Sequence, residues 1–127
     1  MSAKILLVED TEANRYLATF LLENSGYFVV HAANGREAVI AAQNELPDLI
    51  LMDIQMPEVD GYEAARRIKA EPHLAHIPIV AVTSYAMAGD REKAMSLGFA
   101  GYLEKPIVTE TFITEISRFI PKEAATP

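Results

Sequence analysis

Residues 49–53, with the sequence LILMD, decide the fold that we expect for this chain. Four apolar residues stand together without alternation, which is typical of a strand buried on both faces of a parallel sheet. Three more runs end at polar side chains: ILLV (residues 5–8) before Glu9 and Asp10, IVAV (79–82) before Thr83, and GYLE (101–104) before Lys105. Because ligands in an open α/β sheet bind beyond the carboxyl ends of the strands, we expect these polar groups and Asp53 to meet at one edge.

Segments with helical spacing separate the strands. In the first of them, Leu17, Phe20 and Leu21 mark an apolar side that we expect to face the core. Gly26 is typical of the position just past a helix end. Residues 28–32 (FVVHA) form the next expected strand. The chain therefore continues as alternating strands and helices.

Helix starts are marked at two later positions. Asn34 and Asp60 each stand three residues before a glutamate, which is a variant of the capping box. Gly61 is expected to serve a turn with positive φ, and two further helices are expected, one between residues 86 and 97 and one from Thr109. Five strands that alternate with helices predict β-α-β units in one doubly wound α/β domain, a five-stranded parallel sheet in a three-layer sandwich. This pattern leaves the strand order open.

Composition and charge narrow the class of protein. The chain has 127 residues, which suits one domain, and we expect that domain to span residues 1–121 with a flexible tail at 122–127. The net charge of −7 argues against nonspecific nucleic-acid binding. The absence of cysteine excludes disulfides, zinc–thiolate sites and thiol catalysis. No apolar stretch is long enough to span a membrane, and a strand follows the first residues so closely that we expect no signal peptide and a cytoplasmic protein.

The polar residues at the strand ends suit phosphoryl transfer. A carboxylate can attack phosphorus and form an acyl phosphate, provided that the charge on the transferring group is neutralised. Glu9, Asp10 and Asp53 provide three carboxylates for a Mg²⁺ ion, while Lys105 and Thr83 can bind phosphoryl oxygens. Each residue alone has an ordinary explanation as a cap, a turn or a strand end. All of them at successive strand ends form a specific pattern.

The chain resembles the receiver domains of two-component response regulators along essentially its whole length. Five segments carry the resemblance: residues 5–10 (ILLVED), 48–57 (DLILMDIQMP), 60–61 (DG), 82–84 (VTS) and 102–106 (YLEKP). It is also similar to stand-alone, single-domain members of the DivK type, through residues 74–83 (LAHIPIVAVT). The resemblance implies a flavodoxin-like fold with strand order 2-1-3-4-5. It also implies a phosphoacceptor in a phosphorelay that is not an ordinary turnover enzyme.

The resemblance also implies a role for each site residue. Asp53 would accept the phosphoryl group from a phosphohistidine of a sensor kinase or phosphotransfer protein. Asp10, Asp53 and the backbone carbonyl of Gln55 would bind Mg²⁺, and Glu9 would act through water. Lys105 would hold the phosphoryl group, and the peptide between it and the following proline would be cis.

A switch pair and an output face are implied as well. Thr83 would turn towards the phosphoryl group and Tyr102 would follow it, changing the face formed by the fourth helix, fifth strand and fifth helix. That face would be read by a downstream protein rather than by DNA or a membrane, with the chain a monomer or, when phosphorylated, a dimer. Tyr85 and Gln55, each two residues past a site residue, would set the lifetime of the acyl phosphate.

Three other functions remain open from the residues. The chain can be a receiver scaffold that needs no phosphate, or a receiver module of a longer hybrid kinase. A phosphatase of the haloacid dehalogenase class also attacks with an aspartate at a strand end, but such enzymes need a second aspartate where this chain has Gln55. His31, His73 and His76 are expected to be surface or locally bonded residues rather than ligands.

Overall fold

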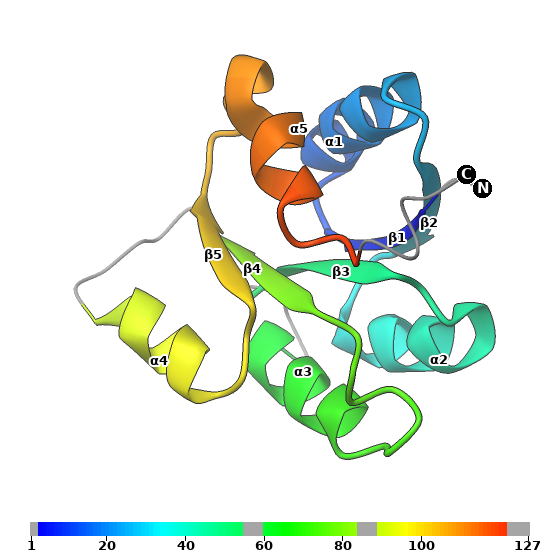
Figure 1. Cartoon of the computed structure of the whole chain (residues 1–127), viewed down its shortest axis with the longest axis vertical. Helices are drawn as coiled ribbons and strands as arrows, with labels where there is room; N and C mark the ends of the chain where they lie inside the picture. Colours follow the sequence, from blue (N-terminus) through cyan, green and yellow to red (C-terminus); the bar gives the residue numbers. More distant parts are fainter. Residues whose placement is uncertain (1–2, 55–59, 84–88, 122–127) are drawn as a thin grey trace.

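The architecture is a five-stranded parallel sheet with strand order β2-β1-β3-β4-β5, as expected (Figure 1). The computed structural model describes residues 3–54, 60–83 and 89–121. The strands are β1 (Lys4–Val8), β2 (Phe28–Ala32), β3 (Leu49–Asp53), β4 (Ile79–Thr83) and β5 (Gly101–Glu104). β3 is central and pairs in parallel with β1 on one side and β4 on the other.

Helices cover both faces of the sheet and complete a three-layer sandwich (Figure 1). They are α1 (Glu12–Asn24), α2 (Gly35–Glu45), α3 (Gly61–Lys69), α4 (Asp90–Ser96) and α5 (Thr109–Ser117). α1 and α5 lie together on one face, and α2, α3 and α4 lie on the other. None of these helices is long and apolar enough to cross a membrane. The predicted doubly wound α/β fold is therefore confirmed.

Two apolar clusters, one on each face of the sheet, explain why the strands are continuously apolar. Leu6, Ile50 and Ile79 point into the cluster under α2, α3 and α4. Their strand neighbours Leu51 and Val80 point into the cluster under α1 and α5. All five residues of β3 are buried, because successive side chains of a strand alternate between two covered faces.

The predicted inner side of α1 is only partly right, because Leu21 packs against the core but Phe20 does not. Its buried residues are Ala18 and Leu22, whereas Phe20 is 56% exposed and Leu17 is only partly covered. Apolar side chains stand around most of this helix, so their spacing alone did not identify the side that meets the sheet. Gly26 does lie just past the helix end with φ +92°, as expected.

Both expected N-caps are present. Asn34 Oδ1 accepts a hydrogen bond from the Glu37 backbone N–H at 2.9 Å, and Asp60 Oδ1 accepts one from the Glu63 N–H at the same distance. Each bond satisfies one of the amide groups left free at a helix start. The Asp60 cap places the first turn of α3 beside the end of β3.

Candidate functional site

The candidate site lies at the carboxyl edge of the sheet, where the polar residues predicted from the sequence converge. Asp53 and Thr83 are the last residues of β3 and β4, Glu9 and Asp10 come directly after β1, and Lys105 comes directly after β5. Parallel strands in register bring these ends together. The edge thus collects three acids, one hydroxyl and one ammonium from four strands.

Glu9, Asp10 and Asp53 form a carboxylate cluster. Each residue offers one oxygen, and these oxygens lie within 4.8 Å of one another. Glu9 and Asp53 are 4% and 5% exposed, while Asp10 lies at the surface. The cluster is therefore open on the Asp10 side and closed below.

Lys105 balances part of this negative charge. Its ammonium lies 2.6 Å from Glu9 Oε1 and 3.2 Å from Asp53 Oδ2. To do so, it extends from the end of β5 across the end of β4 to residues of β3 and β1. The Lys105 backbone N–H donates to the Thr83 carbonyl at 2.8 Å, and the Lys105–Pro106 peptide is cis, as expected.

The pKa values of Glu9 and Lys105 follow from this burial and pairing. Burial raises the pKa of Glu9, although the hydrogen bonds from Lys105 and from the Thr11 backbone N–H oppose the increase. Burial lowers the pKa of Lys105, but its contacts with Glu9 and Asp53 outweigh this and leave that pKa raised. The ammonium stays charged at neutral pH and holds the two buried carboxylates in place.

Gly61 fits the site through close packing rather than through a positive φ, so that prediction is wrong. A Cβ added at Gly61 would lie 2.5 Å from Ile54 Cα and 2.6 Å from the Asp53 carbonyl oxygen. Gly61 is not among the described residues with positive φ. The first residue of α3 must lack a side chain because it packs directly on the backbone that carries Asp53.

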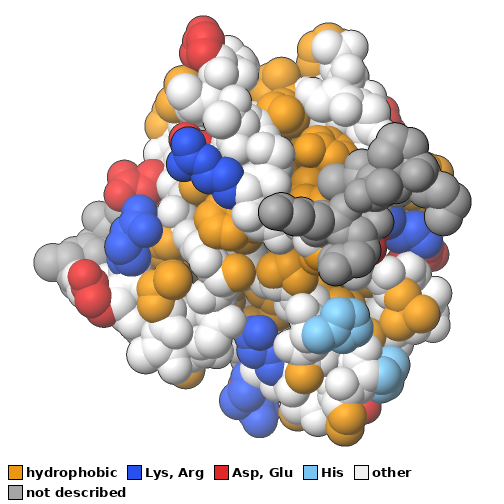
Figure 2. Space-filling model, viewed as in Figure 1, with side chains coloured by type: hydrophobic (Ala, Val, Ile, Leu, Met, Phe, Trp, Pro, Cys, Tyr) orange, Lys and Arg blue, Asp and Glu red, His pale blue; other side chains and the backbone are white. Residues whose placement is uncertain are grey.

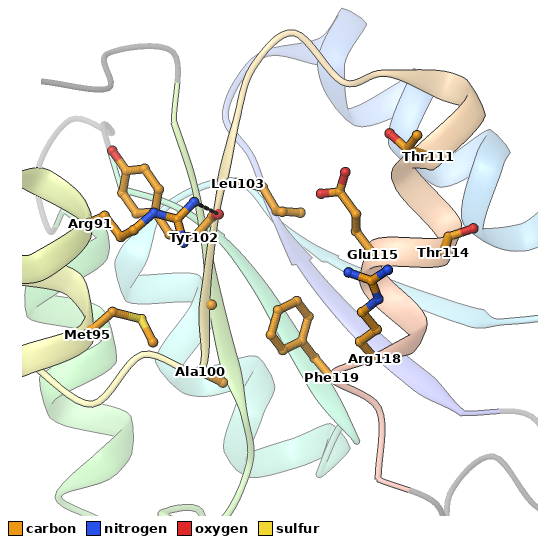
Figure 3. Close-up of a pocket in the computed structure, with 11 residues that line it drawn as sticks. Arg91, Met95, Ala100, Tyr102, Leu103, Thr111, Thr114, Glu115, Arg118 and Phe119 are labelled. Carbon is orange, nitrogen blue, oxygen red and sulfur yellow. Dashed lines mark hydrogen bonds between the residues drawn. The ribbon is translucent and has the colours of Figure 1, made fainter.

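Thr83 on β4 and Tyr102 on the edge strand β5 lie on neighbouring strands next to this cluster. Thr83 is fully buried, and Tyr102 is 4% exposed with its ring packed in the core under α4. The Arg91 guanidinium of α4 lies 5.5 Å from the Tyr102 ring centroid, and Arg91 Nη2 donates to the Tyr102 carbonyl at 3.5 Å (Figure 3). The sequence offered no signal for this contact.

A groove of about 440 Å³ runs along β5 between α4 and α5 (Figure 3). Arg91 and Met95 line it from α4, and Glu115, Arg118 and Phe119 from the α5 side. The Phe119 ring lies over Gly101, where a side chain would collide with it. This groove coincides with the face that the sequence predicted to change on phosphorylation.

Some predicted residues lie elsewhere or cannot be placed. Gln55 and Tyr85 lie outside the described residues. His31 bonds to Thr19 at 2.8 Å, away from the cluster, which fits its expected local role. His73 and His76 line a separate cavity at the opposite end of the molecule, beside Leu46 and Pro47. Sequence reasoning did not find the Lys105–Glu9 ion pair or the packing role of Gly61.

The donor set of the cluster fits a magnesium ion. Mg²⁺ prefers hard oxygen ligands and is usually held by one or two carboxylates together with waters and substrate oxygens. The exposed Asp10 and the buried Asp53 and Glu9 offer such oxygens within 4.8 Å of one another. Cation binding would also relieve the repulsion among three carboxylates that share one lysine.

A parallel α/β sheet with acids, a hydroxyl and a lysine at its carboxyl edge is the arrangement of a receiver domain, and the comparison with known proteins leads to the same class. The family model of the response regulator receiver domain matches residues 5–117. The chain belongs to this family, whose general function is that of a phosphoacceptor in two-component signalling.

Three individual proteins show the similarity in sequence and in structure. The polar-differentiation response regulator DivK of Brucella anthropi is 43% identical over 94% of this chain and 98% of its own length. The chemotaxis protein CheY4 of Vibrio cholerae has a TM-score of 0.89 at 30% identity, covering 94% of this chain and all of that one. The receiver domain of sensor histidine kinase PA1611 from Pseudomonas aeruginosa, solved with a magnesium ion in its active site cleft, has a TM-score of 0.85 at 37% identity, covering 94% and 98%. The chain is therefore a signalling protein similar to DivK and to CheY-type receivers.

Proposed function

We propose that Asp53 is the phosphoacceptor of this chain and that the phosphoryl donor is a phosphohistidine of a sensor kinase or phosphotransfer protein. The observation that carries the proposal is the Asp53 carboxylate itself, placed at the end of the central strand between Lys105 and the Glu9–Asp10 pair. Glu9 shares this lysine and this cluster, but its two oxygens accept from Lys105 at 2.6 Å and from the Thr11 backbone N–H at 3.1 Å, and it lies beyond the end of β1 rather than on the central strand.

The chain's own residues then act in a defined order. An oxygen of Asp53 attacks phosphorus, and the new P–O bond forms as the P–N bond to the donor histidine breaks and returns its electron pair to that nitrogen. Lys105, already held at the site, moves its hydrogen bonds from carboxylates to phosphoryl oxygens. Asp10 and Asp53, with Glu9 acting through water and Gln55 through its carbonyl, would hold Mg²⁺, which supplies neutralising charge to the transferring group.

Thr83 and Tyr102 would carry the signal away from the site. The phosphoryl group adds negative charge and acceptor oxygens, so the Thr83 hydroxyl gains a hydrogen bond by turning towards it. Tyr102 lies on the strand next to that of Thr83, and its ring packs in the core under α4 with the Arg91 guanidinium 5.5 Å from its centroid. We propose that this movement changes the groove along β5 and that a downstream protein reads the change.

The phosphodonor has a suitable docking surface beside the site. α1 begins two residues after Asp10, and it exposes Tyr16 and Phe20, one turn apart, at 73% and 56%. Large exposed apolar side chains are typical of protein contacts.

We propose that the receiver domain spans residues 1–121. Because kinases make phosphohistidine from ATP, we also propose that the protein works in the cytoplasm.

Replacing the acceptor tests the proposal. Wild-type protein incubated with Mg²⁺ and a small acyl phosphate should gain one phosphoryl group by intact-mass spectrometry, and Asp53→Asn should gain none. Asp60→Asn, which changes an exposed aspartate at a helix cap, is the matched control and should be phosphorylated normally. Phosphorylation of Asp53→Asn at the wild-type level would overturn the assignment, and an unphosphorylated wild type would favour the scaffold alternative.

A further inference from the structure

A second groove lies between α3 and α4, apart from the carboxylate site and from the groove along β5. Its volume is about 460 Å³. Six residues line it: Tyr62, Glu63, Arg66, Lys69 and Ala70 from α3 and its end, and Leu97 from the end of α4. It combines an apolar floor with a charged rim, which is the usual make-up of a site for a protein segment.

The rim of this groove is basic in a chain whose net charge is −7. Arg66 and Arg67 share the single carboxylate of Glu63. Lys69 and Lys93 make no ion pair with any residue in the described parts of the chain. Four cations thus stand around the groove with three carboxylates, which are Glu63 in its lining and Asp60 and Asp90 near the Tyr62 ring. Blue side chains are visible over α3 in Figure 2.

The two unpaired lysines are nevertheless positioned. The Lys93 ammonium lies 4.5 Å from the centroid of the Tyr62 ring, a cation–π contact on the groove floor. The Lys69 stem runs beside Gly98, where an added Cβ would lie 3.2 Å from Lys69 Cε. Their charges are therefore presented at fixed places along the groove rather than spread through solvent.

The helix dipole accounts for the positions of these cations along their helices, but not for the groove that they border. Arg66, Arg67 and Lys69 lie in the last turn of α3, where cations stabilise a helix end. Lys93 likewise lies in the last turn of α4, so the same effect applies to it. The apolar side chain that completes the groove, Leu97, is 48% exposed.

We propose that the groove between α3 and α4 docks an acidic segment of a partner protein. An aliphatic or aromatic side chain of that segment would lie against Tyr62 and Leu97, and flanking carboxylates would pair with Lys69 and Lys93. A short segment with a few carboxylates matches the local charge, whereas a nucleic acid would be repelled by the rest of a chain at −7. The proposal does not depend on phosphorylation of Asp53.

A library of random short peptides displayed on phage tests this surface. Selection on the wild-type protein should enrich peptides with net negative charge and at least one large apolar residue. Their affinity should fall about tenfold in a Lys69→Glu/Lys93→Glu variant, because two exposed charge pairs are reversed. The matched control, Arg36→Glu on the exposed start of α2, should bind them as the wild type does.

Two further measurements test whether the enriched peptides bind in this groove. Amide chemical shifts of the wild type titrated with an enriched peptide should change around Tyr62, Lys69 and Leu97. The single Lys93→Gln variant, which leaves the packing of Lys69 unchanged, should weaken binding in the same direction. Enrichment of basic or neutral peptides, no enrichment, shifts confined to the groove along β5, or equal binding by the lysine variants would each overturn the proposal.

Discussion

Some buried polar groups of this protein have hydrogen-bond or ion-pair partners, and others have none among the described residues. Lys105, Glu9 and Asp53 satisfy one another at 2.6 and 3.2 Å. The hydroxyls of Tyr62 and Tyr102, in contrast, are buried without a hydrogen-bond partner among the described residues. A buried hydroxyl without a partner is costly, so such groups often mark places where a structure rearranges.

The two tyrosines should make the protein sensitive to alkaline pH. Burial, and then the charge of Asp90, raise the pKa of both Tyr62 and Tyr102 above 10.0. A raised pKa in the folded state means that their stabilising contribution is complete below pH 10.0 and is lost as pH rises through the folded-state values. We expect the free energy of unfolding in urea to fall in that range, and to fall less steeply in Tyr62→Phe/Tyr102→Phe. Tyr16→Phe, at an exposed position, should follow the wild type; an unchanged slope in the double variant contradicts the prediction.

At this scale the sequence predicted which residues meet but not how they bond. Five polar residues at strand ends were expected to share an edge, and they do. The sequence cannot show that the Lys105 side chain crosses β4 to reach Glu9 as well as Asp53, because that depends on its rotamer and on sheet twist. It also assigned Gly61 a turn role, since a close backbone approach leaves no periodic signal.

At the scale of elements, we expect the site to be most sensitive to substitutions at the contact between α3 and the end of β3. Gly61→Ala would drive a Cβ into Ile54 Cα and the Asp53 carbonyl. We expect this variant to lose about 1–3 kcal/mol of stability and to be phosphorylated more slowly, because the strand end must shift. Thermal unfolding and the rate of phosphorylation by an acyl phosphate measure the two effects.

Gly26→Ala is the control for this prediction. Gly26 has a positive φ but open space around it, so alanine there should cost about 1 kcal/mol and leave the phosphorylation rate unchanged. Equal rates in the wild type and Gly61→Ala would contradict the proposed role of this contact.

Elements differ in how readily they could be predicted. The strands follow from continuous apolar runs, and α2 and α3 follow from their caps. The inner side of α1 was predicted only in part, because apolar side chains surround much of this helix: Leu21 packs against the core, whereas Phe20 is exposed. Leu74 and Ile77, almost fully buried in the turns between α3 and β4, had no periodic pattern to indicate their burial.

At the scale of the whole molecule, magnesium should act as a stabilising ligand. A cation that binds the folded carboxylate cluster and not the unfolded chain raises the free energy of unfolding, by about 1.4 kcal/mol at a concentration about tenfold above its Kd. We expect MgCl₂ to raise the melting temperature of the wild type above that in NaCl of equal ionic strength. Asp10→Asn should lose most of this increase; an equal increase in that variant would place the bound cation elsewhere.

Signal transfer should separate from phosphorylation in variants of the switch pair. Tyr102→Ala and Thr83→Ala leave Asp53 and Lys105 in place, so both should still accept a phosphoryl group. We expect both to lose most of the phosphorylation-dependent part of partner binding, measured by pull-down with and without an acyl-phosphate donor. Wild-type dependence in both variants would show that the groove along β5 does not read this pair.

The central position of β3 has a consequence for motion over time. Every residue of β3 is buried, and the strand pairs on both sides, so its amide hydrogens should exchange with deuterium only when the whole domain unfolds. α4 has only seven residues and covers the edge strand β5, so its amides should exchange through smaller and more frequent openings. A phosphoryl group on Asp53 would thus be anchored to the slowest-opening part of the protein, while the surface that reports it belongs to the fastest.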